Sequence, residues 1–155
     1  MSSIYQNFKK ECKEFAYKQS NDEKFKKLSK EWFTLSEDFK YSYNFEWLGR
    51  PIIQYPQDIV ATQEVIFEVK PDLIIETGIA HGGSLIFSSS QLCILDVMDG
   101  IDPRTSSRKV LGIDIDIREH NRSAIDNHPL SFKIDMLQGS SIDEKIVEQV
   151  KDFAK

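Results

Sequence analysis

The stretch Lys70-Pro-Asp-Leu-Ile-Ile-Glu-Thr-Gly-Ile-Ala-His-Gly-Gly-Ser84 decides the fold. Its apolar run, Leu73 to Ile75, is too short for a helix and is typical of a strand buried in a parallel sheet. Three glycines follow in quick succession, and a new apolar pattern of helical spacing begins at Ser84. The stretch therefore predicts a strand, a glycine loop and the start of a helix.

The residues after Ser84 continue this alternation of strands and helices. A polar loop at 99–108 separates the helix that begins at Ser84 from a second strand, Val110 to Asp114. A short helix is expected at 117–127, a third strand around 132–136 with Lys133 and Asp135 as its polar positions, and a helical tail from 142 to 153. Strands joined by helices, over connections too long for hairpins, predict right-handed crossovers and a parallel α/β sheet.

Residues before the first strand show mainly helical patterns. Apolar residues recur at helical spacing from Ile4 to Ala16, and a second helix is expected from Asp22. The aromatic segment 39–47 is expected to form a loop, and Pro56 starts another helix that runs to Val69. We predict a helical extension over residues 1–50 and a ligand-binding α/β domain over residues 51–155.

Composition excludes several functional classes. The 155 residues contain 20 Lys and Arg against 25 Asp and Glu, which gives a net charge of −5. This charge argues against general electrostatic binding of nucleic acid. The longest apolar run, Leu92 to Leu95, is far too short to span a bilayer, and the N-terminus lacks the apolar core of a signal peptide. Cys12 and Cys93 suggest neither a disulfide framework nor a zinc site. We expect a cytoplasmic protein without a transmembrane segment or a nucleic-acid partner.

The glycine loop carries the predicted chemistry. In an open parallel sheet, ligands bind beyond the carboxyl ends of the strands, which is where this loop lies. Gly78 permits a sharp turn, Gly82 and Gly83 let backbone come close to a ligand, and the helix beginning at Ser84 presents free amides to an anion. Asp114 ends the second strand, where a carboxylate can accept hydrogen bonds from both hydroxyls of a ribose. These positions predict a cofactor that contains a nucleoside.

Spacing distinguishes between two such cofactors. The dinucleotide fingerprint Gly-x-Gly-x-x-Gly is absent, because the loop reads Gly-x-x-x-Gly-Gly. Gly78 and Asp114 are also further apart than the roughly 20 residues of the dinucleotide pattern. S-adenosylmethionine is the better match, since its ammonium suits acidic or carbonyl acceptors and its carboxylate suits helix amides. An NAD-binding oxidoreductase half-domain remains as a weaker alternative.

Four segments of the sequence belong together: Trp47-Leu-Gly-Arg-Pro-Ile-Ile-Gln-Tyr-Pro-Gln-Asp58, Lys70 to Ser84, Gly112-Ile-Asp-Ile-Asp-Ile-Arg-Glu-His-Asn-Arg122, and Gln138-Gly-Ser-Ser-Ile-Asp143. In combination they resemble the family of cephalosporin hydroxylase and rhamnosyl O-methyltransferase, over about residues 43–145. The resemblance implies a Rossmann-like class I methyltransferase fold. It also implies transfer of a methyl group from S-adenosylmethionine to a hydroxyl of a sugar in a glycan or glycolipid, and so a place in lipid or polysaccharide biosynthesis.

The same resemblance implies roles for individual residues. Asp114 would take the ribose, and Ser140 and Ser141 would lie near the adenine. His81 would either contact the ligand or face solvent. The residues implied at the methionine end of the cofactor are Glu76, Gly78, Ala80, Gly82, Gly83 and Ser84.

Two further expectations follow from the family's greater length. Its divalent cation, expected to be Mg²⁺, orients the acceptor oxygen through carboxylates of later strands, so we predict neither catalytic nor metal-binding residues in these 155 residues. Residues 51–155 would then be the cofactor-binding half of a truncated domain, with the parallel strands in the order 3-2-1. The strand Leu73 to Thr77 would have an unpaired edge, through which the chain could self-associate. A non-catalytic remnant or an interaction module is therefore the alternative to an O-methyltransferase.

Overall fold

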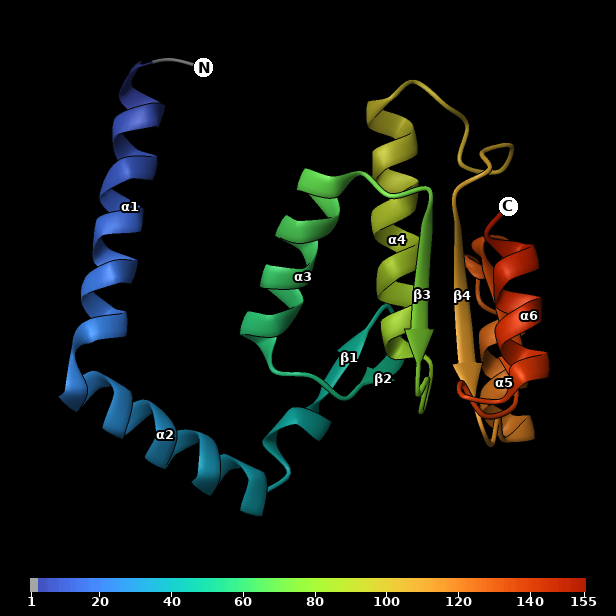
Figure 1. Ribbon diagram of the computed structural model, residues 1–155, viewed down its shortest axis with the longest axis horizontal. Helices are drawn as coiled ribbons and strands as arrows, with labels where there is room; N and C mark the ends of the chain where they lie inside the picture. The colour runs from blue at the N-terminus through green and yellow to red at the C-terminus, as the bar shows by residue number, and fades with distance from the viewer. Residues whose placement is uncertain (1–2) are drawn as a thin grey trace. The chain divides into compact units, whose positions relative to one another are not determined.

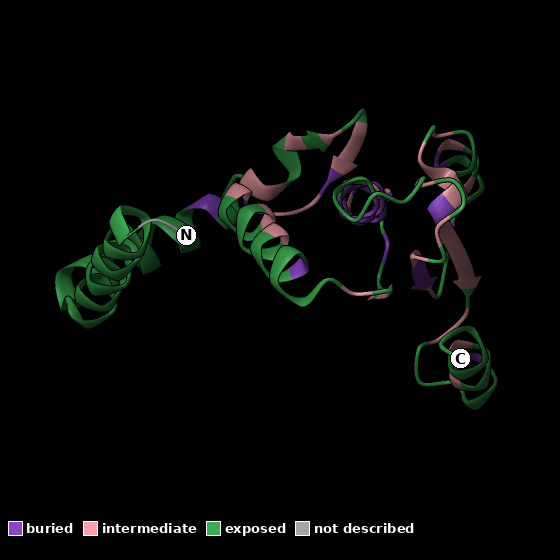
Figure 2. Cartoon of the chain, turned by 90° about the horizontal axis from the view of Figure 1, so that it is seen from above, coloured by how far each residue is buried: buried purple, intermediate pink, exposed green. Residues whose placement is uncertain are grey.

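The computed structural model describes residues 3–155, which form part of two compact units, Met1–Tyr41 and Ser42–Lys155. The first unit contains the two predicted N-terminal helices, α1 (Ser3–Asn21) and α2 (Glu23–Asp38). Asp22 caps α2, because its side chain accepts a hydrogen bond from the backbone amide of Phe25 at 2.7 Å. Both helices are exposed along almost their whole length, as the green ribbon in Figure 2 shows.

The second unit is built on a parallel sheet of three strands, β3 (Leu73–Thr77), β4 (Lys109–Asp114) and β5 (Ile134–Gln138), in the order β3-β4-β5. Figure 1 shows β3 beside β4. Glu76 pairs with Gly112, and Gly112 with Met136. The predicted Rossmann-like α/β class, with three parallel strands after N-terminal helices, is confirmed. No strand among residues 3–155 pairs with the outer edge of β3.

Helices cover both faces of this sheet. Alternate residues of β4 point to opposite sides, so Val110 joins the larger apolar cluster with α4 (Gly83–Met98) and Leu111 joins a smaller one with Ile146 of α6 (Glu144–Phe153). Side chains of α3 (Pro56–Val69) and α5 (Glu119–Asp126) also belong to the larger cluster. In Figure 2, α4 is the helix seen end-on and coloured as buried, which makes it the centre of the core.

The aromatic segment before the sheet is not simply a loop. A 3₁₀ turn, η1 (Tyr41–Asn44), is followed by a small antiparallel hairpin of β1 (Phe45–Trp47) and β2 (Arg50–Ile52). Leu48 and Gly49 join the strands with φ of 47° and 83°, the double left-handed conformation of a tight hairpin turn. Trp47 holds the hairpin on α4: its ring lies edge-on to that of Phe87 at 4.9 Å, and its Nε1 donates to Ser90 at 3.1 Å.

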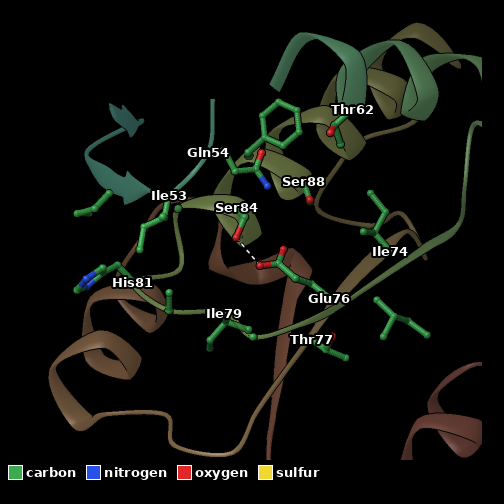
Figure 3. Close-up of a pocket in the computed structure, with 16 residues that line it drawn as sticks. Ile53, Gln54, Thr62, Ile74, Glu76, Thr77, Ile79, His81, Ser84 and Ser88 are labelled. Carbon is green, nitrogen blue, oxygen red and sulfur yellow. Dashed lines mark hydrogen bonds between the residues drawn. The ribbon is translucent and has the colours of Figure 1, made fainter. Parts of the chain in front are cut away.

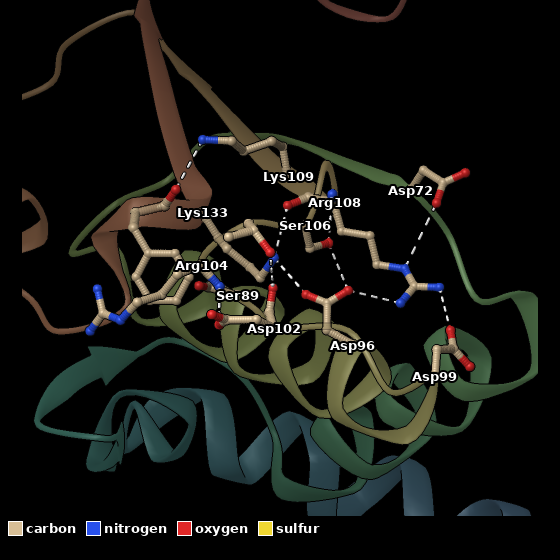
Figure 4. Close-up of polar contacts among 12 residues, drawn as sticks. Asp72, Ser89, Asp96, Asp99, Asp102, Arg104, Ser106, Arg108, Lys109 and Lys133 are labelled. Atoms are coloured by element: carbon tan, nitrogen blue, oxygen red, sulfur yellow. Dashed lines mark hydrogen bonds and ion pairs between the residues drawn. The ribbon is translucent and has the colours of Figure 1, made fainter.

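The third strand lies two residues later than predicted, and the reason is Lys133. The chain forms a 3₁₀ turn, η2 (Ser131–Lys133), before β5, and the Lys133 side chain is 1% exposed rather than pointing to solvent. Its Nζ lies 2.6 Å from the buried carboxylate of Asp96 on α4 and also donates to the carbonyl oxygen of Arg108 at 3.2 Å (Figure 4). A buried ion pair therefore replaces the predicted polar alternation.

Within residues 3–155, no helix combines the length and the apolar composition that a membrane-spanning helix requires.

Candidate functional site

Two pockets open where β3 ends, and Thr77 and Gly78 line both of them. Each is named here after the end of the cofactor that the sequence leads us to expect in it. The methionine-side pocket has a volume of about 320 Å³ and extends from Glu76 toward the start of α4. The ribose-side pocket has a volume of about 340 Å³ and extends toward Asp114 and Ser140. A ligand with two distinct halves could therefore lie across Gly78, with one half on each side.

The acidic side chain of the methionine-side pocket is Glu76. Because residues alternate along β3, Glu76 points to the same face as Ile74, toward α4. The hydroxyl of Ser84, in the first turn of α4, donates a hydrogen bond to Glu76 Oε1 (Figure 3). Burial raises the pKa of Glu76 above its ordinary value, while the hydrogen bond from Ser84 acts in the opposite direction. The pocket thus holds a carboxylate that lacks a cationic partner.

The loop after β3 turns at Gly78, whose φ is 80°. A side chain at this position would meet no atom within 4 Å, so Gly78 faces open space between the two pockets. Gly82 and Gly83 are different, because their neighbours are protein atoms. A Cβ at Gly82 would overlap the side chain of Ile125, and one at Gly83 would lie 2.6 Å from the carbonyl carbon of Pro51. These two glycines allow α5 and β2 to approach the start of α4.

Two residues that the sequence did not single out fix the middle of the loop. Arg50, on β2, donates to the carbonyl oxygen of His81 from Nε at 3.0 Å and from Nη2 at 2.5 Å. Asn121, on α5, is 6% exposed; its Oδ1 accepts from Arg50 Nη2 at 3.2 Å, and its Nδ2 donates to the carbonyl oxygen of Ala80 at 3.1 Å. The loop is therefore held from two elements, including Ala80 in its left-handed conformation at φ 45°.

Asp114 organises the ribose-side pocket. Its Oδ2 accepts a hydrogen bond from the backbone amide of Ile79 at 2.8 Å, and its Oδ1 accepts one from the amide of Asp116 at 3.0 Å. Its carbonyl oxygen accepts from the amide of Gly139 at 2.8 Å, which brings the loop after β5 alongside. Ser140 and Ser141 complete the lining of this pocket.

The structure brings together nearly all of the site residues that the sequence predicted. Gly82 lines neither pocket and instead forms the left-handed N-cap of α4. Gly78, Asp114, Ser140 and Ser141 line the ribose-side pocket. The predicted residues that line the methionine-side pocket are Glu76, Gly78, Ala80, His81, Gly83 and Ser84.

Gln54 is a third residue that the sequence did not single out. It lies between β2 and α3 and lines the methionine-side pocket. Its Oε1 is buried and accepts no hydrogen bond from any described residue. In the sequence, Gln54 stood out only because it lies inside the Trp47 to Asp58 segment of the family resemblance. That resemblance predicted no role for its side chain.

Within residues 3–155, no three His, Cys, Asp or Glu side chains gather closely enough to hold a metal ion. The described residues therefore do not form a site for the divalent cation that the resemblance implies.

Comparison with protein families places the chain in a family. The family described as rhamnosyl O-methyltransferase/CmcI matches residues 39–155, which include the whole sheet and both pockets. The chain belongs to this family. The resemblance seen in the sequence is confirmed, and membership of the rhamnosyl O-methyltransferase/CmcI family indicates an O-methyltransferase with a small-molecule cofactor and an acceptor. Comparisons with curated proteins and with solved structures returned no match.

Proposed function

We propose that this chain binds S-adenosylmethionine across its two pockets and serves the transfer of a methyl group to a hydroxyl, with a sugar of a glycan or glycolipid as the acceptor. Membership of the rhamnosyl O-methyltransferase/CmcI family supports O-methyl transfer. The observation that carries the choice of cofactor is the pair of pockets on either side of Gly78, one with an acidic group that lacks a cationic partner and the other with Asp114.

The residues suit the two ends of this cofactor. Glu76 offers an acceptor for an ammonium group, and the first turn of α4 offers free backbone amides for a carboxylate. Asp114 and the loop after β5 offer acceptors and a hydroxyl-lined surface for a ribose and its base. When bound, S-adenosylmethionine supplies a methyl group on a positively charged sulfur. The chain's own residues bind and orient it, and no step of the proposal depends on a metal.

Isothermal titration with S-adenosylhomocysteine tests the proposal. The wild-type chain is expected to bind it with one site, and Asp114→Asn is expected to weaken binding by about 10-fold or more, because a charged acceptor for hydroxyl groups is lost. Asp116→Asn is the matched control, since Asp116 lies two residues further along, is exposed and lines neither pocket. The proposal is overturned if the wild-type chain does not bind S-adenosylhomocysteine, or if a fluorescence titration shows tighter binding of NADH.

A further inference from the structure

The surface of α2 carries a stripe of apolar side chains. Its members are three or four residues apart, so they share one face of the helix. They are Phe25, Leu28, Trp32 and Leu35. Each is between 47% and 57% exposed, and the ring of Trp32 also lies edge-on to that of Tyr41 at 5.5 Å. A stripe with this spacing is typical of the seam along which one helix packs against another.

The charges of α2 are separated along the helix. Residues 23–30 contain four lysines and one glutamate, whereas residues 31–38 contain three acidic residues and no basic one. This order largely opposes the helix dipole, which favours acidic side chains near the N-terminus and basic side chains near the C-terminus. A helix of 16 residues also depends on packing of its apolar face for most of its stability. A partner that covers the stripe and reverses the charge order would offset both effects.

A second copy of α2 has the reverse charge order when the two helices run antiparallel. Two-fold symmetry then places each basic half against an acidic half. The stripes match as well, because Phe25 meets Leu35 of the second copy. In the next layer, Leu28 meets Trp32 of the second copy. The charge separation is a property of α2 and not of α1, whose lysines and glutamates are mixed along the helix.

Lys24 and Asp38 flank the stripe at its two ends. In the antiparallel register, Lys24 lies beside Asp38 of the second copy, and the symmetry forms this pair twice. Among the described residues, neither side chain has an ion-pair partner, whereas Lys26 and Lys27 are paired within α2 at 2.9 Å and 3.9 Å. Glu31 would meet its own copy at the axis, where Lys27 of the same helix compensates its charge.

We propose that α2 is a self-association surface, along which two copies of this chain pair antiparallel through the apolar stripe and the two Lys24–Asp38 pairs. A lipid surface suits α2 less well, because its lysines and acidic residues are equal in number and give no net attraction to anionic lipids. The surface lies outside residues 39–155, over which the chain matches its family, and pairing requires no cofactor.

Sedimentation velocity of the full chain over a concentration series tests the pairing. The wild-type chain is expected to show a monomer–dimer equilibrium in the micromolar range, since one pair of short helices buries a small interface. Lys24→Asp and Asp38→Lys are each expected to weaken dimerisation by about 10-fold, because two attractive pairs become repulsive. Both changes suit the helix dipole better than the native residues, so a weaker dimer cannot be ascribed to unfolding of α2.

An equal mixture of the two single variants is the decisive sample. In a heterodimer of the Lys24→Asp chain with the Asp38→Lys chain, both pairs are attractive again, so the mixture is expected to recover the wild-type affinity. The chain with both substitutions is expected to recover it for the same reason. Lys13→Glu reverses an exposed charge on α1 and is the control, expected to leave dimerisation unchanged.

Three results would overturn the proposal. The first is a wild-type chain that stays monomeric at every concentration, whether or not it binds vesicles of phosphatidylglycerol. The second is a dimer that both single variants leave intact, which would place the contact elsewhere on the chain. The third is a mixture that associates no more strongly than either single variant alone.

Discussion

Arg50 donates two hydrogen bonds to a single acceptor, the carbonyl oxygen of His81, across 31 residues of sequence. The planar guanidinium thereby fixes the loop that separates the strand β3 from the helix α4. Asn121 accepts a hydrogen bond from the same guanidinium and donates one to the carbonyl oxygen of Ala80, so β2 and α5 both hold this loop. The pockets on either side of Gly78 depend on the shape that these contacts impose.

Arg50→Lys is therefore expected to loosen the loop while preserving the charge. A lysine ammonium cannot present the planar pair of N–H donors that His81 accepts. We expect the free energy of unfolding to fall by about 1–2 kcal/mol in chemical denaturation and the affinity for S-adenosylhomocysteine to fall with it. Arg118→Lys, at an exposed arginine, is the control and is expected to change stability by less than about 0.5 kcal/mol. Equal effects of the two substitutions would contradict the role of Arg50.

Ligand affinity is expected to depend on pH through Glu76. Burial raises the pKa of Glu76 above the ordinary 4.5, with the Ser84 hydrogen bond opposing the shift, so the folded chain holds this proton more tightly than the unfolded chain. The ionised form consequently lowers the stability of the ligand-free chain as pH rises through the raised pKa. A bound ammonium favours the ionised form, so binding releases the proton and affinity increases over the same pH range. Titration calorimetry at several pH values should show this increase, and Glu76→Gln should abolish it.

The buried pair of Lys133 and Asp96 is expected to matter for stability. Lys133→Met leaves the Asp96 carboxylate, which is 0% exposed, without its nearest cation, and should lower the free energy of unfolding by about 3 kcal/mol. Lys109→Met is the matched control. Lys109 lies 3.5 Å from Asp135 in a half-exposed pair, and its loss should cost less than about 1 kcal/mol. Urea denaturation measures both, and similar losses would refute the distinction.

The lowered pKa of Asp96 predicts how the stability of the chain changes in acid. Burial acts to raise its pKa, but hydrogen bonds from Lys133, Ser106 and Arg108 outweigh burial and lower the pKa below the ordinary value. A carboxylate with a lowered pKa contributes stability above the unfolded-state pKa of about 3.9 and loses it as pH falls through the folded-state value. Asp96→Asn should therefore flatten the loss of stability below about pH 4 in urea titrations.

Two glycines of the loop should respond differently to the same substitution. Gly83→Ala places a methyl group 2.6 Å from the carbonyl carbon of Pro51 and 2.8 Å from the Cα of Ile52, where only backbone could move aside. We expect a loss of about 3 kcal/mol in unfolding free energy. Gly78→Ala meets no atom but must adopt φ near 80°, and should cost about 1–2 kcal/mol. A larger effect at Gly78 than at Gly83, by thermal or urea unfolding, would contradict this comparison.

The sequence by itself determined the α/β class, the order of elements and the place of the glycine loop. These properties depend on local patterns: a short apolar run predicts β3, and the alternation of residues along it puts Glu76 on the same face as Ile74. The same reasoning put Asp114 at the end of the neighbouring strand, and the parallel register of β3 and β4 brings the two carboxylates to one edge of the sheet.

Only the tertiary structure decided which other side chains reach that edge. Arg50 and Asn121 meet at the loop although 71 residues separate them, and Gln54 enters the pocket from a segment whose sequence gives no sign of its direction. Lys133 looked like a surface residue because its neighbours alternate, yet it is buried against Asp96 of α4. Local periodicity reports which face of an element a residue occupies. Long-range pairing depends on which elements pack together, and that is settled only when the whole core assembles.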